Sequence, residues 1–314
     1  MPGRNSAVVF AYHNVGARGI EVLLSCGVDI QLVVTHEDNP NENIWFDSVE
    51  ALAKRNDIPV IKPDDPNTPD IVNKIQALAP ARIFSFYYRH MLQAPLLDIP
   101  TAGAFNMHGS LLPKYRGRVP VNWAIINGET KTGASLHRMV LKPDAGSLLD
   151  QQAVPILPND TATDVFQKVT LAAETVLLRT LPKMLDGTAK ETPLVLSSGS
   201  YFGGRKPADG LIDWSRSAQE IHNLIRAVAP PYPGAFFDLG NKRLTILGSY
   251  YRQDRADACQ PRLHWKDSRF WADCADGRSL ILTQAELDGK PLSESLFKQN
   301  FGEEFLLSKE LESL

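Results

Sequence analysis

The chain has 314 residues, of which 43% are hydrophobic and 22% are charged, and its formal net charge is -3. This length favours two domains, and the composition is typical of a soluble globular protein without general affinity for nucleic acid or anionic lipid. No apolar run is long enough for a transmembrane helix or a signal peptide. Cys26, Cys259 and Cys274 are scattered without a CxxC pair, which favours a reducing, cytoplasmic setting.

Short apolar runs alternate with helical patterns through the first part of the chain. This alternation predicts a doubly wound, mostly parallel α/β sheet. Neither GxGxxG nor GxxxxGK[ST] follows the first run, so a dinucleotide site or a P-loop has no direct support. The expected strands are residues 7–11, 30–34, 59–61, 82–87 and 102–105, and the expected helices between them include residues 48–54 and the pattern Ile71, Ile75 and Leu78.

The stretch FNMHGSLLPKYRGR, residues 105–118, organises the chain. Asn106 and His108 are two residues apart, so in an extended strand their side chains project to the same face. The carboxyl end of a strand is where open α/β sheets bind ligands. An amide donor beside an imidazole suits a reaction in which a carbonyl oxygen becomes an oxyanion and an amine loses a proton. From these two residues alone, a turn with a hydrogen-bonded histidine stays an open alternative.

Beyond this stretch, a helix over residues 119–127 is expected to end at Gly128. Two further strands are expected, over residues 132–137 and 147–154. Asp144 lies between them in a loop that Pro143 and Gly146 interrupt, where aspartate is most often a turn former. A long helix with a continuous apolar stripe is expected over residues 160–185.

The composition changes near Ser197, where a run rich in glycine, serine and proline indicates a crossing between domains. We therefore expect one domain over residues 1–200 and a second over residues 206–314. A helix within residues 212–229, followed by short strand patterns, predicts a small β-barrel for the second domain. The tail from residue 296 suits either a packed extension or a closing helix, and Gly302 weakens the helical pattern.

Several motifs, in order, carry a family resemblance. The run HGSLLPKYRG, preceded by Asn106 and followed by Asp144 in a PDAG loop, resembles the folate-dependent formyltransferases. The motifs VFAYHNVG, FSFYYRHML, NGET, TGASLHRM, FGGRKPADG and RAVAPPYPGAF resemble one subfamily, the formyltransferase part of the bifunctional lipid A modification enzyme of Gram-negative bacteria. That subfamily formylates UDP-4-amino-4-deoxy-L-arabinose with 10-formyltetrahydrofolate. The resemblance is strong over about residues 6–250 and weak in the tail.

The resemblance implies a Rossmann-like domain followed by an OB-like barrel, and a catalytic set of Asn106, His108 and Asp144. It implies no metal, and the histidines also lack a ligand spacing such as HxxxH. Met91 and Leu92 by themselves also suit core packing. The resemblance assigns the 10-formyltetrahydrofolate pocket to His90, Met91, Leu92, Arg118, Val140, Leu141, Lys142 and Pro143.

The expected partner is a UDP-linked amino sugar, without nucleic acid and without membrane insertion. Arg205 and Lys206 suit its diphosphate, because guanidinium pairs with phosphate oxygens, although a solvated loop explains them equally well. Tyr232 suits a wall of the sugar or uracil site, and a purely structural contact between the two domains stays an open alternative. The chain carries no second half with a decarboxylase fingerprint. We expect a stand-alone cytoplasmic transferase in lipopolysaccharide biosynthesis and polymyxin resistance, with the decarboxylase on a separate chain, and a homo-oligomer remains open.

Two other classes stay in view. The first is another folate-dependent formyltransferase that acts on a different amino-sugar nucleotide, on initiator methionyl-tRNA or on glycinamide ribonucleotide. A tRNA enzyme is expected to show a basic face, whereas the loop YHNVGARG after the first strand is short and only mildly basic. The second is a hydrolase of formyl-folate, which the presence of Asn106, His108 and Asp144 does not exclude.

Overall fold

The structure is a computed structural model that describes residues 3, 5–38, 46–255 and 260–307, so Cys259 lies outside the described residues. The chain divides into two compact units. The first comprises Met1–Pro120, Thr132–Val154 and Gln167–Gly203, and the second comprises Val121–Lys131, Pro155–Phe166 and Gly204–Leu314. Two short segments within residues 1–200 thus belong to the second unit, and the domain boundary near residue 200 stays a prediction.

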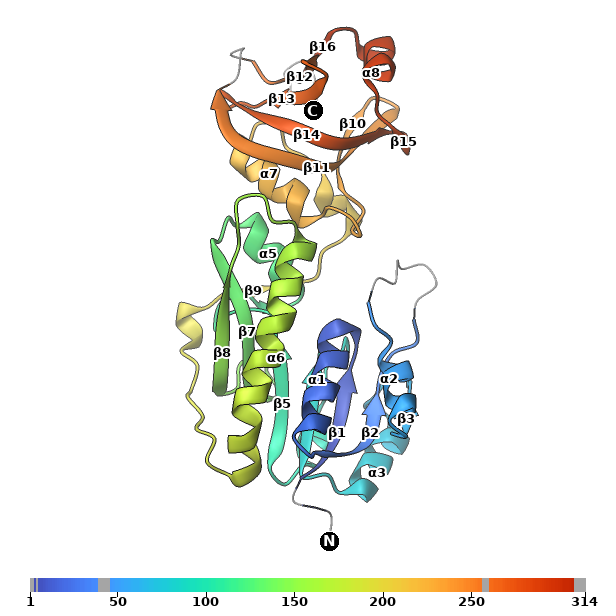
Figure 1. Cartoon of the computed structure of the whole chain (residues 1–314), viewed down its shortest axis with the longest axis vertical. Coiled ribbons are helices and arrows are strands. Elements are labelled where there is room, and N and C mark those ends of the chain that lie inside the picture. The colour runs from blue at the N-terminus through green and yellow to red at the C-terminus, as the bar shows by residue number, and fades with distance from the viewer. Residues whose placement is uncertain (1–2, 4, 39–45, 256–259, 308–314) are drawn as a thin grey trace. The chain divides into compact units, whose positions relative to one another are not determined.

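Strands and helices alternate strictly along the chain up to residue 108 (Figure 1). In chain order the elements are β1 (Ser6–Ala11), α1 (His13–Ser25), β2 (Asp29–Val34), α2 (Val49–Arg55), β3 (Val60–Ile61), α3 (Pro69–Leu78), β4 (Arg82–Phe86), α4 (Ala94–Leu97), β5 (Gly103–His108), β6 (Arg116–Gly117), α5 (Pro120–Ile126), β7 (Lys131–Arg138), β8 (Leu148–Pro155), α6 (Ala162–Asp186), η1 (Leu196–Ser198) and β9 (Tyr201–Phe202).

The main sheet of the first unit has the strand order β3-β2-β1-β4-β5-β7-β8. The pairs from β3 through β5 are parallel, and β5 pairs with β7 antiparallel. Every residue of β1 and β4 is buried, as expected of parallel strands that are covered on both faces. Figure 1 shows α1 in front of β1, and α6 in front of the sheet near β5. The predicted doubly wound, mostly parallel sheet is confirmed. The order of the strands reverses between β1 and β4, the kind of position at which such sheets bind ligands.

The strand that carries the organising stretch is longer than predicted. β5 extends to His108, whereas the predicted strand ended at residue 105, so Asn106 and His108 both lie on the strand. The following helix, α5, ends before Gly128, whose φ of 70° is the left-handed conformation that the glycine there predicts. The apolar stripe of α6 is buried as predicted, and it comprises Val165, Phe166, Val169, Ala172, Ala173, Val176 and Leu177.

The second unit contains an antiparallel sheet with the strand order β10-β11-β14-β13-β12-β16, and β15 pairs with β14. The sheet is a curled half-barrel, which confirms the predicted small β-barrel fold. Its further elements, in chain order, are η2 (Pro207–Gly210), α7 (Ala218–Ala227), β10 (Ala235–Leu239), β11 (Lys242–Arg255), β12 (Arg262–Lys266), β13 (Arg269–Asp273), β14 (Arg278–Leu287), β15 (Lys290–Pro291), α8 (Glu294–Phe301) and β16 (Glu304–Leu306).

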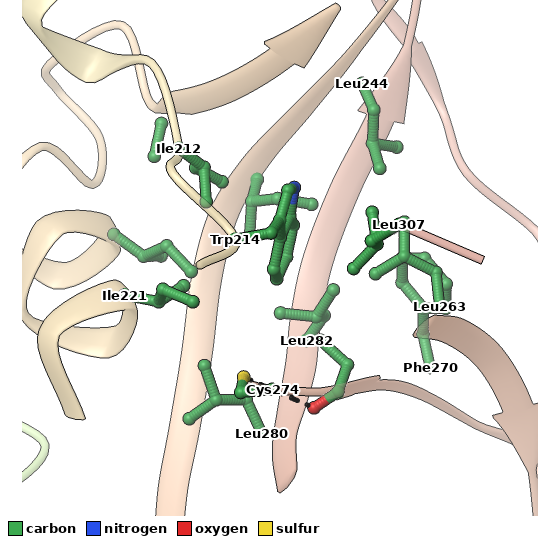
Figure 2. Packing of buried hydrophobic residues seen from close by; sticks show 14 of the residues in the cluster. Ile212, Trp214, Ile221, Leu244, Leu263, Phe270, Cys274, Leu280, Leu282 and Leu307 are labelled. Atoms are coloured by element: carbon green, nitrogen blue, oxygen red, sulfur yellow. Dashed lines mark hydrogen bonds between the residues drawn. The ribbon is translucent and has the colours of Figure 1, made fainter. Parts of the chain in front are cut away.

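A hydrophobic core fills the concave side of this sheet. Trp214 lies fully buried among side chains from α7, β11, β13 and β14, as Figure 2 shows. A capping box between Ser217 and Glu220 begins α7, whose apolar face adds Ile221 and Ile225 to the core. The tail combines both predicted forms, because α8 ends before Gly302 and Phe305 lies on the edge strand β16.

Candidate active site

Asn106 and His108 project from β5 at the carboxyl end of the main sheet. β5 lies between β4 and β7, and the antiparallel register places His137 of β7 opposite Asn106. The loop after β7 brings Asp144 to the same place, and its backbone φ of 49° is in the left-handed region. Aspartate tolerates this conformation better than most residues. The structure therefore brings together the three residues that the sequence predicts as a catalytic set.

The Asp144 carboxylate is the centre of this cluster. Its Oδ1 lies 3.5 Å from Nδ1 of His108 and 3.4 Å from Nε2 of His137. Oδ1 also lies 3.5 Å from the side-chain nitrogen of Asn106, at the outer limit of a hydrogen bond. The main-chain N–H of Gly117 donates to Oδ2 at 2.8 Å. One carboxylate thus faces two imidazoles, one amide and one peptide N–H.

These neighbours keep Asp144 ionised. The side chain is only 12% exposed, and burial by itself raises the pKa of a carboxyl group. The electrostatic effects of the His108 and His137 imidazoles and the hydrogen bond from the N–H of Gly117 outweigh this effect and hold the pKa of Asp144 well below its usual range. The site therefore contains a fixed negative charge at neutral pH.

A main-chain carbonyl fixes the orientation of His108. Nε2 of this buried ring donates to the carbonyl oxygen of Tyr115 at 2.7 Å. Because a carbonyl only accepts, Nε2 must carry a hydrogen. Nδ1, which faces Asp144, is therefore the nitrogen that can exchange a proton. The sequence assigned no step to Tyr115, because a main-chain carbonyl leaves no signature in the residue type.

His137 is the site residue that the sequence prediction missed. It is 2% exposed, and its Nδ1 donates to the carbonyl of Arg138 at 2.8 Å. Its Nε2 then accepts from the side-chain amide of Asn106, 3.2 Å away. Ser135, two residues earlier on the same face of β7, bonds the main chain at Ser110 and Leu112. A signal was present, since the polar residues Ser135 and His137 alternate with apolar residues in the run ASLH.

The residues predicted for a folate pocket differ in environment. Met91 is 52% exposed, whereas Leu92 is buried in the core of the first unit, so its side chain packs rather than faces a ligand. Asn67 holds this segment through the carbonyl of Met91 and the N–H of Gln93. His90, Arg118, Val140, Leu141 and Lys142 are exposed, and Pro143 is partly buried. Their role as a pocket stays a prediction.

The residues predicted for the sugar nucleotide lie in the second unit. The Arg205 guanidinium lies 4.9 Å from the ring centroid of Trp123, and it donates to the carbonyl of Asp209 at 2.7 Å. Lys206 has an exposed side chain, and its main-chain N–H bonds Asp209. Tyr232 is partly buried, and burial raises the pKa of its hydroxyl while a hydrogen bond with Asn122 lowers it. Substrate contacts of these residues stay predictions.

The described residues contain neither a metal cluster nor a membrane-spanning helix. Within residues 3, 5–38, 46–255 and 260–307, histidine, cysteine, aspartate and glutamate side chains form no group of three suited to a metal ion. In the same ranges, every helix is too short or too polar to cross a membrane.

The sequence matches known formyl transferases in both units. Residues 16–181 match the formyl transferase family, and residues 205–301 match the formyl transferase C-terminal domain. The chain therefore belongs to the formyl transferase family. This confirms the predicted enzyme class. The range that matches the formyl transferase family includes Asn106, His108 and Asp144.

Solved structures with this fold include sugar formyltransferases. The N-formyltransferase from Helicobacter canadensis, in complex with folinic acid and dTDP-3-aminofucose, has a TM-score of 0.70 and 21% identity over 88% of this chain and 98% of that chain. WlaRD, a sugar 3N-formyltransferase, has a TM-score of 0.69 and 21% identity over 92% and 99% of the two chains. HypX from Aquifex aeolicus, in complex with tetrahydrofolic acid, has 16% identity and a TM-score of 0.62 over 93% of this chain and 46% of that chain. At these identities the likeness shows the fold alone.

Proposed function

We propose that this chain transfers the formyl group of 10-formyltetrahydrofolate to the amine of a nucleotide-linked amino sugar. The convergence of Asn106, His108 and Asp144 at the end of β5 carries this proposal. The similar structures of the Helicobacter canadensis enzyme and of WlaRD each contain a formyl-folate and a dTDP compound. These ligands support a formyl-folate donor and a nucleotide-linked acceptor. The motif resemblance supports the finer choice, UDP-4-amino-4-deoxy-L-arabinose, in lipid A modification.

The cluster has the groups that acyl transfer to an amine requires. The neutral amine attacks the formyl carbon, and the carbonyl oxygen becomes an oxyanion. The side-chain amide of Asn106, only loosely bound to Asp144, is the donor for this oxyanion. The attacking amine gives a proton to Nδ1 of His108, the carbon–N10 bond breaks, and the same proton goes to N10 of the folate. The Asp144 anion stabilises the imidazolium between these steps.

The folate carries a flat pterin ring. Such a ring is bound by main-chain donors and acceptors beside apolar walls. Met91, Val140 and Leu141 are 52%, 41% and 66% exposed, so their apolar side chains are accessible to a ligand. We propose that these side chains and the main chain beside them bind the folate.

The charge of the chain favours a small anionic acceptor. A tRNA acceptor requires many cationic contacts, and its binding depends steeply on salt. The chain has 33 lysine and arginine residues against 36 aspartate and glutamate residues. A sugar nucleotide brings only a diphosphate, which one or two cations such as Arg205 and Lys206 can bind.

An acceptor panel tests the proposed function. We expect formylation of UDP-4-amino-4-deoxy-L-arabinose at a matched 10-formyltetrahydrofolate concentration, with a rate that declines only modestly as salt rises. Mass spectrometry of the products measures it. The panel also contains dTDP-3-aminofucose, initiator methionyl-tRNA and glycinamide ribonucleotide. Formylation of the dTDP sugar alone would retain the class and change the sugar, whereas formylation of the tRNA or the ribonucleotide alone would overturn the proposal.

Replacing Arg205 tests the sugar-nucleotide contact. We expect Arg205→Ala to raise KM for the sugar nucleotide about tenfold and to leave KM for the folate nearly unchanged, because one substrate loses a charged ground-state contact. Steady-state kinetics with each substrate varied in turn measures the difference. Arg216→Ala is the matched control, since Arg216 is an exposed arginine of the same unit that pairs with Asp213 and Glu220. Equal KM effects on both substrates would contradict the assignment.

A further inference from the structure

A segment far along the chain lies directly on the catalytic loop, which we define as residues 113–118. This segment, residues 199–202, is the clamp segment. β6 of the loop pairs in parallel with β9 of the clamp segment. The N–H of Arg116 donates to the carbonyl of Ser200 at 3.0 Å, and the N–H of Arg118 donates to the carbonyl of Phe202 at 3.0 Å. In return, the N–H of Ser200 donates to the carbonyl of Pro113 at 3.3 Å.

One side chain of the clamp segment adds a bond at the centre of the loop. The hydroxyl oxygen of Ser200 accepts from the main-chain N–H of Tyr115 at 2.9 Å. Tyr115 is buried and has a φ of 57°, a conformation that costs free energy for a residue with a side chain. Its ring also stacks on Phe202, with centroids 5.2 Å apart and planes 11° from parallel. Ser200 and Phe202 thus hold Tyr115 in a strained conformation.

The catalytic loop in turn holds two members of the proposed catalytic set. The carbonyl of Tyr115 accepts from Nε2 of His108, and the N–H of Gly117 donates to Asp144. Gly117 has a φ of 96°, and a Cβ there would lie 2.2 Å from the carbonyl oxygen of Phe202. The clamp segment therefore packs against the loop at both points from which His108 and Asp144 are held.

We propose that Ser200 is a positioning residue for His108. Its hydroxyl accepts from the N–H of Tyr115 and thereby fixes the Tyr115 carbonyl against Nε2 of His108. Nδ1 of His108 then faces Asp144. Ser200 bonds the loop at Tyr115, and Tyr115 in turn bonds His108. Without the hydroxyl, a buried N–H loses its acceptor, which costs free energy and loosens the strained residue. The inference rests on the proposed function, in which Nδ1 of His108 moves the proton.

The test compares Ser200→Thr with Ser200→Val, whose side chains have nearly the same size and differ in the hydroxyl. We expect Ser200→Val to lower kcat by about 10-fold to 10²-fold, with little change in either KM, because misplacement of a catalytic group acts on the chemical step. We expect Ser200→Thr to retain most of kcat. Ser198→Ala is the matched control, since its hydroxyl donates to Val195 within the neighbouring turn.

A second measurement does not depend on the substrate. Nitrogen-15 NMR of the imidazoles reports the hydrogen-bonded Nε2–H of His108, and His108→Gln identifies the signal. We expect Ser200→Val to weaken or lose this signal and Ser200→Thr to keep it. An unchanged signal and an unchanged kcat in Ser200→Val would overturn the proposal. If the acceptor is wrong, the wild-type chain also forms no product, and the NMR comparison alone still confirms or overturns the role of Ser200.

Discussion

Replacement of His108 by alanine is expected to lower kcat by about 10²-fold to 10⁴-fold while the fold stays intact. The variant loses the imidazole whose Nδ1 faces Asp144 and whose Nε2 is bonded to Tyr115. The measurement is steady-state formylation of the sugar nucleotide, with circular dichroism and thermal unfolding as checks of the fold. Near wild-type turnover at neutral pH would exclude His108 as the proton carrier.

His108→Gln separates the two functions of this side chain. A glutamine amide can still donate to the carbonyl of Tyr115, yet it cannot exchange a proton near neutral pH. We expect this variant to resemble His108→Ala in kcat and the wild-type protein in thermal stability. A glutamine variant with high activity would show that the hydrogen bond to the loop matters more than proton transfer.

Replacement of Asp144 by asparagine is expected to lower kcat by about 10²-fold or more. The amide has nearly the same shape as the carboxylate, but it lacks the charge and turns one acceptor atom into a donor. In the wild-type protein the N–H of Gly117 and the amide of Asn106 both donate to Asp144. The new donor of the asparagine would therefore face another donor. Asp70→Asn, at an exposed position in the first turn of α3, is the matched control.

The pH profile gives a second measurement on Asp144. The lowered pKa means that the carboxylate and its stabilising contacts are present above its unfolded pKa of about 4, and they are lost only as the pH falls through the lower folded pKa. An acidic limb of activity between about pH 5 and 7 therefore belongs to another group. In Asp144→Asn we expect this limb to move to lower pH, because protonating an imidazole is harder without the anion. Identical limbs in both proteins would contradict the proposed role.

The spacing of residues in the sequence determined the fold class and two members of the site, and the family resemblance added Asp144 as the third. Alternating apolar runs and helical patterns predicted the main sheet, because buried parallel strands and amphipathic helices each require a characteristic spacing. Asn106 and His108 were predicted to share a face from their two-residue separation alone, and Asp144 was placed in a loop by Pro143 and Gly146. These are local properties, which neighbouring residues decide.

Packing between distant segments decided the rest of the site. His137 reaches Asn106 only through the antiparallel register of β5 and β7, and Leu92 packs in the core although its neighbour Met91 is exposed. Tyr115 holds His108 through a carbonyl, and Ser200 reaches Tyr115 across 85 residues of chain. Strand register and main-chain hydrogen bonds depend on how the elements pack and scarcely on residue type. The sequence therefore determined which side chains could do the chemistry, and the tertiary structure decided what holds them in place.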